Sequence, residues 1–413
     1  MANMYLNVVD LKLVLLVVVA LVALLLQYVL RLRRFTLVNK YASWQRDAQA
    51  VETATHEAKG CMAGMISIIM PVNERCASRA ELLMESLLRQ KSDVGYEIIL
   101  ADEGHSEIVR DLIKRGQKAF SNLRYTFVPE TARYIEGRKL AITLGVKAAR
   151  GEWVLILDAQ TQPLHDEWLH HFVQNLSDDS DMVQAYYNYE DNGQWMARRA
   201  ILDGVDHFVQ KVAAWEKGVT LDCGCTNWAM RKSFFMARNG FADSVNLPFG
   251  EEAILANLHV SADRLSILCA ADTKVTLALS RKAEISSMRV QDSEVKHHLT
   301  NGAHKFFVQD AVSSAMLYVM VVSVVCYVGV RVFDDLMANS YSLGYIYTDA
   351  LCIAVLMVAF LLPFVLIRKS LRTLNERRYG AYIYLYYLLR PFHTMATSCV
   401  RWECKRSFVR KFI

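Results

Sequence analysis

The residues of this 413-residue chain that could do chemistry begin with Asp158, which follows an apolar run from Trp153 to Leu157. Such a run is typical of a buried strand, and a polar turn closed by Pro163 follows it. A carboxylate at a strand end can hold a divalent cation and, through it, a phosphate group. A second acid is expected two residues on, but that position is Gln160, whose amide oxygen attracts a cation less strongly. The sequence therefore leaves open whether this site is modified or has lost its chemistry.

Three further apolar runs imply the elements that position these acids: 66–70 before Pro71, 97–101 before Asp102, and 124–128 before Pro129. Helical periodicity lies between them. Strands that recur about every 30 residues with helices between predict an α/β domain with a parallel sheet covered on both faces. In such a sheet the ligand lies beyond the carboxyl ends of the strands. The rule collects five residues at one rim: Asn73, Glu74, Asp102, Glu103 and Asp158.

Two cations, Arg138 and Lys139, begin the helical segment before the fourth strand. Because carboxylates repel phosphate, a phosphorylated ligand at this rim needs a bridging divalent cation or these two side chains. A nucleoside diphosphate fits, with one acid bonding the base or ribose and another holding Mg²⁺ or Mn²⁺. The chain has no Walker-type loop, and no G-x-G-x-x-G follows a strand, which argues against kinases and dinucleotide enzymes.

Three apolar segments predict membrane helices. The run 13–30 contains Gln27 as its one polar side chain, and 311–330 and 350–367 carry no charge. Each is long enough to cross a bilayer core of about 30 Å. The first ten residues carry no positive charge, so a retained anchor is favoured over a cleaved signal peptide. The shorter apolar stretch 381–389 is predicted to be interfacial or folded back.

Charges beside these segments predict their orientation. Arginines follow the first and third segments, whereas the short loop after the second holds Asp334, Asp335 and Asp349 against Arg331. By the positive-inside rule, residues 31 to about 310 and the C-terminal tail are cytoplasmic. The net charge of +5 then reflects basic residues near anionic lipid, and nucleic-acid binding is not expected. The nine cysteines are predicted to be free thiols, and Cys223 and Cys225 to be non-catalytic.

Four segments in order resemble a family 2 glycosyltransferase of the GT-A fold, in its membrane-anchored bacterial form. They are GRKLAITLGVKAARGEWVLILDAQTQP (137–163), GCTNWAMRKSFF (224–235), FGEEAIL (249–255) and KHHLTNGAHKF (296–306). The resemblance covers roughly residues 64 to 370. It implies a Rossmann-like nucleotide-sugar domain with a mostly parallel sheet, plus one N-terminal and two C-terminal transmembrane helices.

The resemblance also implies roles. Glu252 aligns with the general base, and Glu251 lies beside it as a second catalytic candidate. Asp158 is the retained first acid of the DxD motif, and Gln160 replaces the second, so Mg²⁺ or Mn²⁺ would be held weakly by these two. Contacts to the nucleotide sugar and its phosphates are expected from Asn73, Glu74, Asp102, Glu103, Arg138, Lys139, Asp158, Gln160, Asn227, Arg231 and His298.

The predicted organisation is an anchor (1–37), a helical stalk (38–63), a cytoplasmic catalytic domain (64–310), two membrane helices (311–370) and a basic tail with the interfacial segment (371–413). The predicted function is transfer of a sugar from a nucleotide-diphosphate sugar, with inversion, to a lipid-linked or cell-envelope glycan acceptor. The reaction would take place at the cytoplasmic face of a bacterial inner membrane.

Alternatives stay open at this point. The acceptor could be a polyprenyl phosphate, which needs no base, or the fold could serve as a non-catalytic membrane scaffold. Asp158 could simply cap the next helix, and Glu251 and Glu252 could simply complement a helix dipole. A processive synthase is disfavoured because the Q-x-x-R-W segment is missing. Three histidines are interpreted as the polar face of a helix rather than as metal ligands: His165, His170 and His171.

Overall fold

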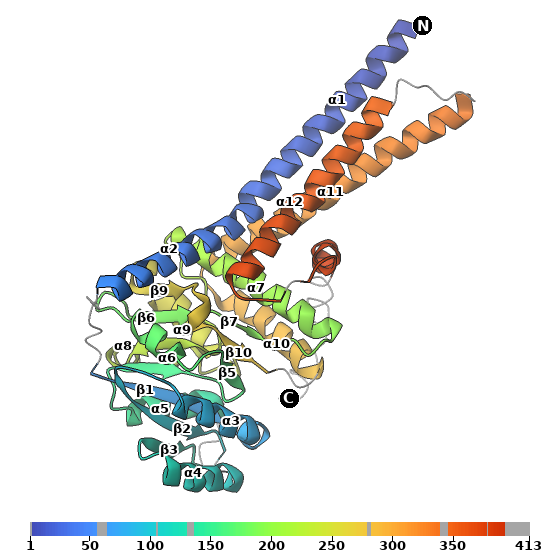
Figure 1. Cartoon of the computed structure of the whole chain (residues 1–413). Helices are drawn as coiled ribbons and strands as arrows, with labels where there is room; N and C mark the ends of the chain where they lie inside the picture. Colours follow the sequence, from blue (N-terminus) through green and yellow to red (C-terminus); the bar gives the residue numbers. More distant parts are fainter. Residues whose placement is uncertain are drawn as a thin grey trace, which may run out of the picture.

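The computed structural model describes residues 2–55, 64–104, 106–129, 136–278, 282–338, 346–377 and 379–392. Figure 1 shows an α/β domain at one end and long helices that extend away from it at the other. Residues 393–413, about half of the predicted basic tail, lie outside the described residues. The predicted domain boundaries stay predictions.

The core of the α/β domain is a seven-stranded sheet in the order β3-β2-β1-β4-β8-β6-β9. The first four strands in this order are parallel, β8 is antiparallel to both of its neighbours, and β6 pairs in parallel with β9. The predicted mostly parallel sheet is confirmed. The strands are β1 (Met65–Val72), β2 (Gly95–Asp102), β3 (Leu123–Phe127), β4 (Trp153–Ile156), β6 (Met182–Ala185), β8 (Trp228–Arg231) and β9 (Leu265–Leu268).

Helices cover both faces of this sheet because its strands are apolar on both sides. Ile68 and Met70 of β1 pack with one set of helices, and the alternate residue Ile69 packs with the other. The first set is α3 (Ala77–Leu88), α4 (Glu107–Ala119) and α6 (Trp168–Val173). The second is α5 (Gly137–Ala148), α7 (Trp195–Glu216), α8 (Lys232–Ala237) and α9 (Glu251–His259).

A smaller sheet lies beside the site, in the order β5-β10-β7. Its strands are β5 (Thr161–Pro163), β7 (Tyr187–Tyr189) and β10 (Val275–Leu277). Because β5 follows Asp158 directly, this sheet fixes the turn that carries that residue. Helix α10 (Lys282–Val295) then leads to the membrane part, and a short 3-10 helix (Lys296–His298) ends it.

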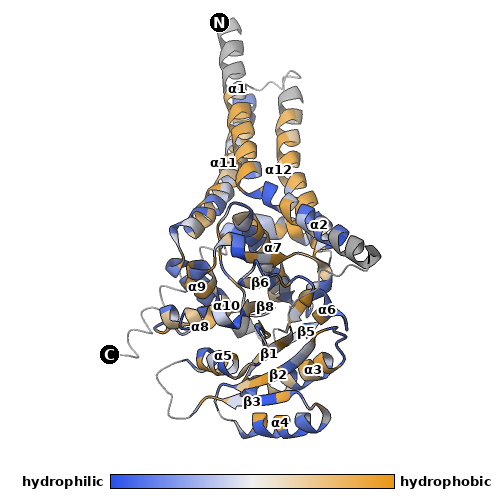
Figure 2. Cartoon of the chain, turned by 90° about the vertical axis from the view of Figure 1, so that its left-hand side faces the viewer, coloured by the Kyte–Doolittle hydropathy of each residue, from blue (hydrophilic) through white to orange (hydrophobic). Residues whose placement is uncertain are grey.

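Three helices in the described part of the chain are long and apolar enough to cross a membrane: Leu15–Asp47, Asn301–Met337 and Ala350–Thr373. The first combines α1 (Ala2–Gln27), a π-helical turn (Tyr28–Leu32) and α2 (Arg33–Thr55), and the others are α11 (Asn301–Ala338) and α12 (Ile346–Thr373). Figure 2 shows their apolar residues concentrated at the end away from the sheet. These helices agree with the predicted positions of the membrane segments.

A buried ion cluster joins the helical bundle to the α/β domain. Arg31 lies 2.8 Å from Asp206 of α7 and 3.5 Å from Asp310 of α11. Arg390, from a helical segment that folds back after α12, lies 2.5 Å from both aspartates. The side chain of Arg31 is 3% exposed, so these charges depend on one another rather than on water. The cluster ties segments from both ends of the chain to α7.

Candidate active site

The turns after β1 and β2 hold the first part of the predicted rim together. Asn73 caps the turn after β1, and its amide nitrogen donates to Glu103 at 2.9 Å. Glu74 accepts a hydrogen bond from Ser106 at 3.0 Å. The two strand ends are thereby fixed side by side, which leaves Glu103 half-buried at the rim.

Asp102 belongs to the framework of this rim. Its side chain is fully buried, and its two oxygens accept hydrogen bonds from the backbone nitrogens of Gly104 and Ser106 and from the Tyr125 hydroxyl. Burial and the adjacent carboxylate raise the pKa of Tyr125 to about 12. Since both oxygens of Asp102 are used inside the protein, Glu103 is the member of this acidic pair that is placed to meet a ligand.

Asp158 lies just beyond β4, at the carboxyl edge of the parallel strands, as predicted. Its backbone nitrogen donates to the Thr226 hydroxyl at 2.9 Å, and its Oδ1 accepts from the backbone nitrogen of Gln160 at 2.9 Å. Its Oδ2 accepts from Arg138 at 2.9 Å. The side chain is 19% exposed. One oxygen therefore orders the turn, and the other faces the site.

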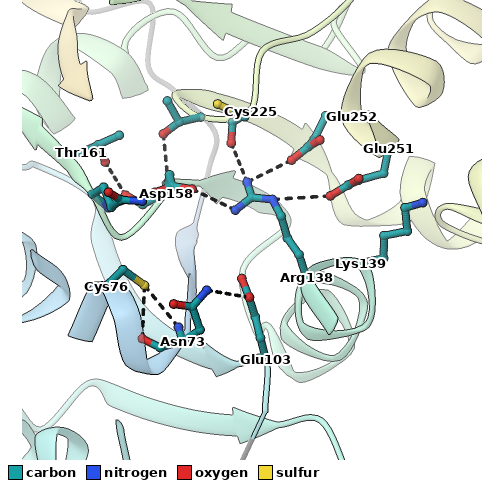
Figure 3. Close-up of polar contacts among 12 residues, drawn as sticks. Asn73, Cys76, Glu103, Arg138, Lys139, Asp158, Thr161, Cys225, Glu251 and Glu252 are labelled. Carbon is teal, nitrogen blue, oxygen red and sulfur yellow. Dashed lines mark hydrogen bonds and ion pairs between the residues drawn. The ribbon is translucent and has the colours of Figure 1, made fainter. Parts of the chain in front are cut away.

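Arg138 is the centre of the site (Figure 3). Its guanidinium donates to Asp158 at 2.9 Å, to Glu252 at 3.1 Å and to the backbone carbonyl of Cys225 at 2.8 Å, and its Nε lies 3.4 Å from Glu251. Burial lowers the pKa of Arg138, but the three carboxylates outweigh burial and hold that pKa well above its usual value. The guanidinium thus connects motifs that lie more than 100 residues apart in the chain.

A glycine lets the start of α5 come close enough for this arrangement. A Cβ atom at Gly137 would lie 2.8 Å from the backbone oxygen of Glu103. Because glycine has no Cβ, the first turn of α5 approaches the end of β2 and carries Arg138 into the site.

Glu251 and Glu252 begin α9, after Gly250 in a left-handed conformation (φ 78°). A Cβ atom at Gly250 would lie 2.2 Å from Val295, so this entry to the helix is closely packed. Both glutamates are buried, and Oε2 of Glu251 has no hydrogen-bond partner among the described residues. Burial and the charge of Glu251 raise the pKa of Glu252 to about 7, although Arg138 opposes this rise. A carboxyl group poised near neutral pH suits a general base.

Like Asp102, two more residues predicted to contact the nucleotide sugar, Lys139 and Asn227, have their side chains used inside the protein. Lys139 is buried and donates to the carbonyls of Ser244 and Leu247, which stabilises the loop before α9. Asn227 (φ 61°) is fully buried, and its amide nitrogen bonds the carbonyls of Tyr186 and Thr273. The structure thus corrects their expected role as ligand-binding residues to a framework role.

Arg231 lies apart from the site. Arg231 pairs with Trp153 at the opposite end of β4 from Asp158, where it bonds Asp178 and Glu152. Its predicted role in donor binding is therefore wrong, because the antiparallel direction of β8 carries it away from the rim. His298 is exposed, and no contact joins it to Arg138 or its acidic neighbours in the part of the chain that the structure describes.

Sequence reasoning missed two contributions from the segment before β8. The Cys225 carbonyl accepts from Arg138, and the Thr226 hydroxyl accepts from the backbone of Asp158. The segment 224–235 is recognised as a motif, but the motif assigns no role to these two groups, because their position depends on β8 pairing antiparallel with β4. Burial raises the pKa of the Cys225 thiol to about 12, so this residue contributes its backbone and not its thiolate.

The donor set for a divalent cation is small. Among the described residues, no group of three or more His, Cys, Asp or Glu side chains is arranged to hold a metal ion. The carboxylates nevertheless converge on a positive charge, because one guanidinium lies within 3.4 Å of three of them. The residues therefore fit a cation that Asp158 would share with a diphosphate rather than a metal held by protein side chains alone.

The fold and the site together define a glycosyltransferase of the GT-A fold. Residues 67–238 match the model of the family described as Glycosyl transferase family 2.

Similar solved structures include the mannosyltransferase PcManGT from Pyrobaculum calidifontis, in complex with GDP-Man and Mn²⁺ (14% identity, 83% of this chain, 98% of that chain, TM-score 0.47). Others are TarS from S. aureus (16% identity, 61% and 43% coverage, TM-score 0.37) and mannosyl-3-phosphoglycerate synthase from Rubrobacter xylanophilus (14% identity, 56% and 72% coverage, TM-score 0.38). At this distance they assign no substrate to this chain.

Proposed function

We propose that this protein transfers a sugar, with inversion, from a nucleotide-diphosphate sugar to a hydroxyl group of a lipid-linked or cell-envelope glycan. The observation that carries the proposal is the contact of one guanidinium with both the strand-end Asp158 and the helix-start Glu252. Arg138, the positive charge proposed to bind the leaving diphosphate, thereby lies in direct contact with Glu252, the proposed base for the acceptor hydroxyl.

The chemistry follows from these positions. Glu252 takes the proton of the acceptor hydroxyl, and the acceptor oxygen attacks the anomeric carbon. The bond from that carbon to the diphosphate oxygen breaks, and the electron pair leaves with the nucleoside diphosphate. Arg138 stabilises the charge that develops on the departing diphosphate. Attack from the face opposite the diphosphate inverts the anomeric configuration.

A divalent cation, when bound, neutralises part of the diphosphate charge. Asp158 would hold it, and the Gln160 amide oxygen is the second candidate ligand. Glu103 and Asn73, linked at the rim, are proposed to meet the nucleoside. This assignment leaves Arg138 for the phosphates and Glu252 for the acceptor.

The proposed location is the cytoplasmic face of the bacterial inner membrane. The arginines that follow α1 and α12 support this orientation by the positive-inside rule. The membrane helices join the catalytic domain through the ion pairs of Asp206 on α7, which would keep the site close to the bilayer surface. A lipid-linked acceptor is concentrated at that surface.

The test uses the purified full chain in lipid nanodiscs, incubated with a panel of UDP- and GDP-sugars and with Mg²⁺ or Mn²⁺. Transfer to a lipid-linked glycan fraction, lost in Glu252→Gln, is the expected result. Transfer to polyprenyl phosphate that persists in Glu252→Gln would replace the proposed acceptor class. If no nucleotide binds with or without metal, the scaffold alternative replaces the enzyme.

A further inference from the structure

Each nitrogen of the Arg138 guanidinium already has a partner within the protein, and these contacts leave one of its five N–H groups for another acceptor. Its three nitrogens are used by Asp158 (2.9 Å), Glu251 (3.4 Å) and Glu252 (3.1 Å), and one of them also donates to the Cys225 carbonyl. A bidentate contact with phosphate oxygens needs two N–H groups, so it must replace at least one of these contacts.

Loss of these contacts is costly because Arg138 neutralises three carboxylates. Lys139, the next cation in the sequence, directs its ammonium to backbone carbonyls and not to the acids. Arg138 is therefore the one positive side chain among the described residues that contacts Asp158, Glu251 and Glu252 directly. Carboxylates buried to this degree are unstable as anions without a partner.

The exposed side of the group indicates which contact can be exchanged. The side chains of Glu251 and Glu252 are 2% and 5% exposed, whereas those of Asp158 and Arg138 are 19% and 18% exposed. The Arg138–Asp158 contact is therefore more open to a ligand than the contacts of Arg138 with Glu251 and Glu252. Figure 3 shows Arg138 between Asp158 on one side and the two glutamates on the other.

We propose that Arg138 and a divalent cation compete for Asp158, and that nucleotide diphosphate resolves the competition by giving the guanidinium another partner. While Asp158 Oδ2 accepts from Arg138, it has less electron density to offer a cation. A diphosphate offers the guanidinium a bidentate contact of comparable strength. Asp158 is then free for the cation, so cation binding depends on nucleotide. This inference rests on the proposed function for the identity of the ligand. The experiment that tests it measures Mn²⁺ binding and does not depend on sugar transfer.

The experiment measures Mn²⁺ binding to the full chain in nanodiscs without nucleotide, from the electron paramagnetic resonance signal of free Mn²⁺. Arg138→Gln should bind Mn²⁺ about 5- to 150-fold more tightly than wild type, the usual range of coupling between two binding events. Arg138→Lys keeps the charge and should gain less. The matched control is Arg264→Gln, which removes an arginine paired with Asp181 on the surface and should change nothing.

A double variant, Arg138→Gln with Asp158→Asn, assigns the gain to Asp158, because it should return Mn²⁺ affinity to the wild-type level or below. UDP or GDP should raise the Mn²⁺ affinity of wild type more than that of Arg138→Gln. Circular dichroism melts confirm that each variant is folded.

The proposal is wrong if folded Arg138→Gln and Arg138→Lys both bind Mn²⁺ no more tightly than wild type, or if the double variant keeps the gain. These readouts need no sugar transfer. A failure of the proposed function would instead appear as absent transfer with the Mn²⁺ pattern intact.

Discussion

Replacement of Glu252 by glutamine tests the site most directly. The change keeps the size of the side chain and its ability to accept a hydrogen bond from Arg138, now 3.1 Å away, but removes the basic carboxylate. Removal of a general base typically costs about 10²–10⁴-fold in rate, which corresponds to roughly 3–5 kcal/mol of transition-state stabilisation. Nucleotide binding should change little, because Arg138 and Asp158 remain.

The pH dependence gives a second magnitude. Burial and the negative charge of Glu251 raise the pKa of Glu252 to about 7, and only the ionised form can take a proton from the acceptor. The transfer rate should therefore fall as pH decreases through 7, to about one tenth of its maximum one pH unit below the pKa. Because Glu251 and Glu252 titrate as a pair, the midpoint belongs to both.

The assay is initial-rate transfer of a radiolabelled sugar from pH 5.5 to 8.5 at saturating donor, with nucleotide affinity measured in parallel by calorimetry. In Glu252→Gln the transfer rate should be much lower, and the decrease of the rate at acid pH should disappear. A variant that retains wild-type transfer to a hydroxyl acceptor would refute the assignment of the base. Loss of nucleotide affinity in step with the rate would instead show that Glu252 serves binding.

Three further results are expected. Ionised Glu252 is disfavoured in the folded state, so the free energy of unfolding of wild type should fall as pH rises from about 4.5 to about 7. Glu252→Gln should remove this pH dependence in thermal melts. An equal change of stability with pH in both proteins would contradict the expectation. In calorimetric titrations with nucleotide, Gln160→Asp should strengthen Mn²⁺ binding and Asp158→Asn should weaken it, whereas unchanged values would reduce Asp158 to a turn residue. A reporter fused at the C-terminus should be cytoplasmic and one inserted near Ser340, outside the described residues, should be on the far side; cytoplasmic access to both would overturn the topology.

Much of the fold could be predicted because its signals are local. Apolar runs that end in a polar turn marked β1, β2, β3 and β4, and uncharged runs marked the membrane helices. The rule that ligands lie beyond the carboxyl ends of parallel strands predicted the rim, and this rule placed Asp158 and Glu103 at the same edge of the sheet.

The roles of individual side chains were harder to predict, because they depend on direction and on distant partners. Arg138 and Lys139 are neighbours, yet successive residues on a helix point about 100° apart, so one faces the acids and the other faces the loop before α9. The Asp102 carboxylate is used by the Tyr125 hydroxyl of β3 and so is not presented to a ligand. Arg231 lies away from the rim because β8 runs antiparallel to β4. None of these is visible in the local sequence.

The ion cluster of Arg31, Asp206, Asp310 and Arg390 bears on how the protein can be made and divided. Its members span the chain from the first membrane helix to the segment after the third, so the cluster can close only after almost the whole polypeptide has been synthesised. A chain cut down to the soluble domain would keep Asp206 on α7 but lose all of its arginine partners. The same cut would remove the segments that carry Arg31 and Arg390 and cover Asp206, so a fragment limited to the α/β domain would expose to water a part of α7 that is buried in the whole chain.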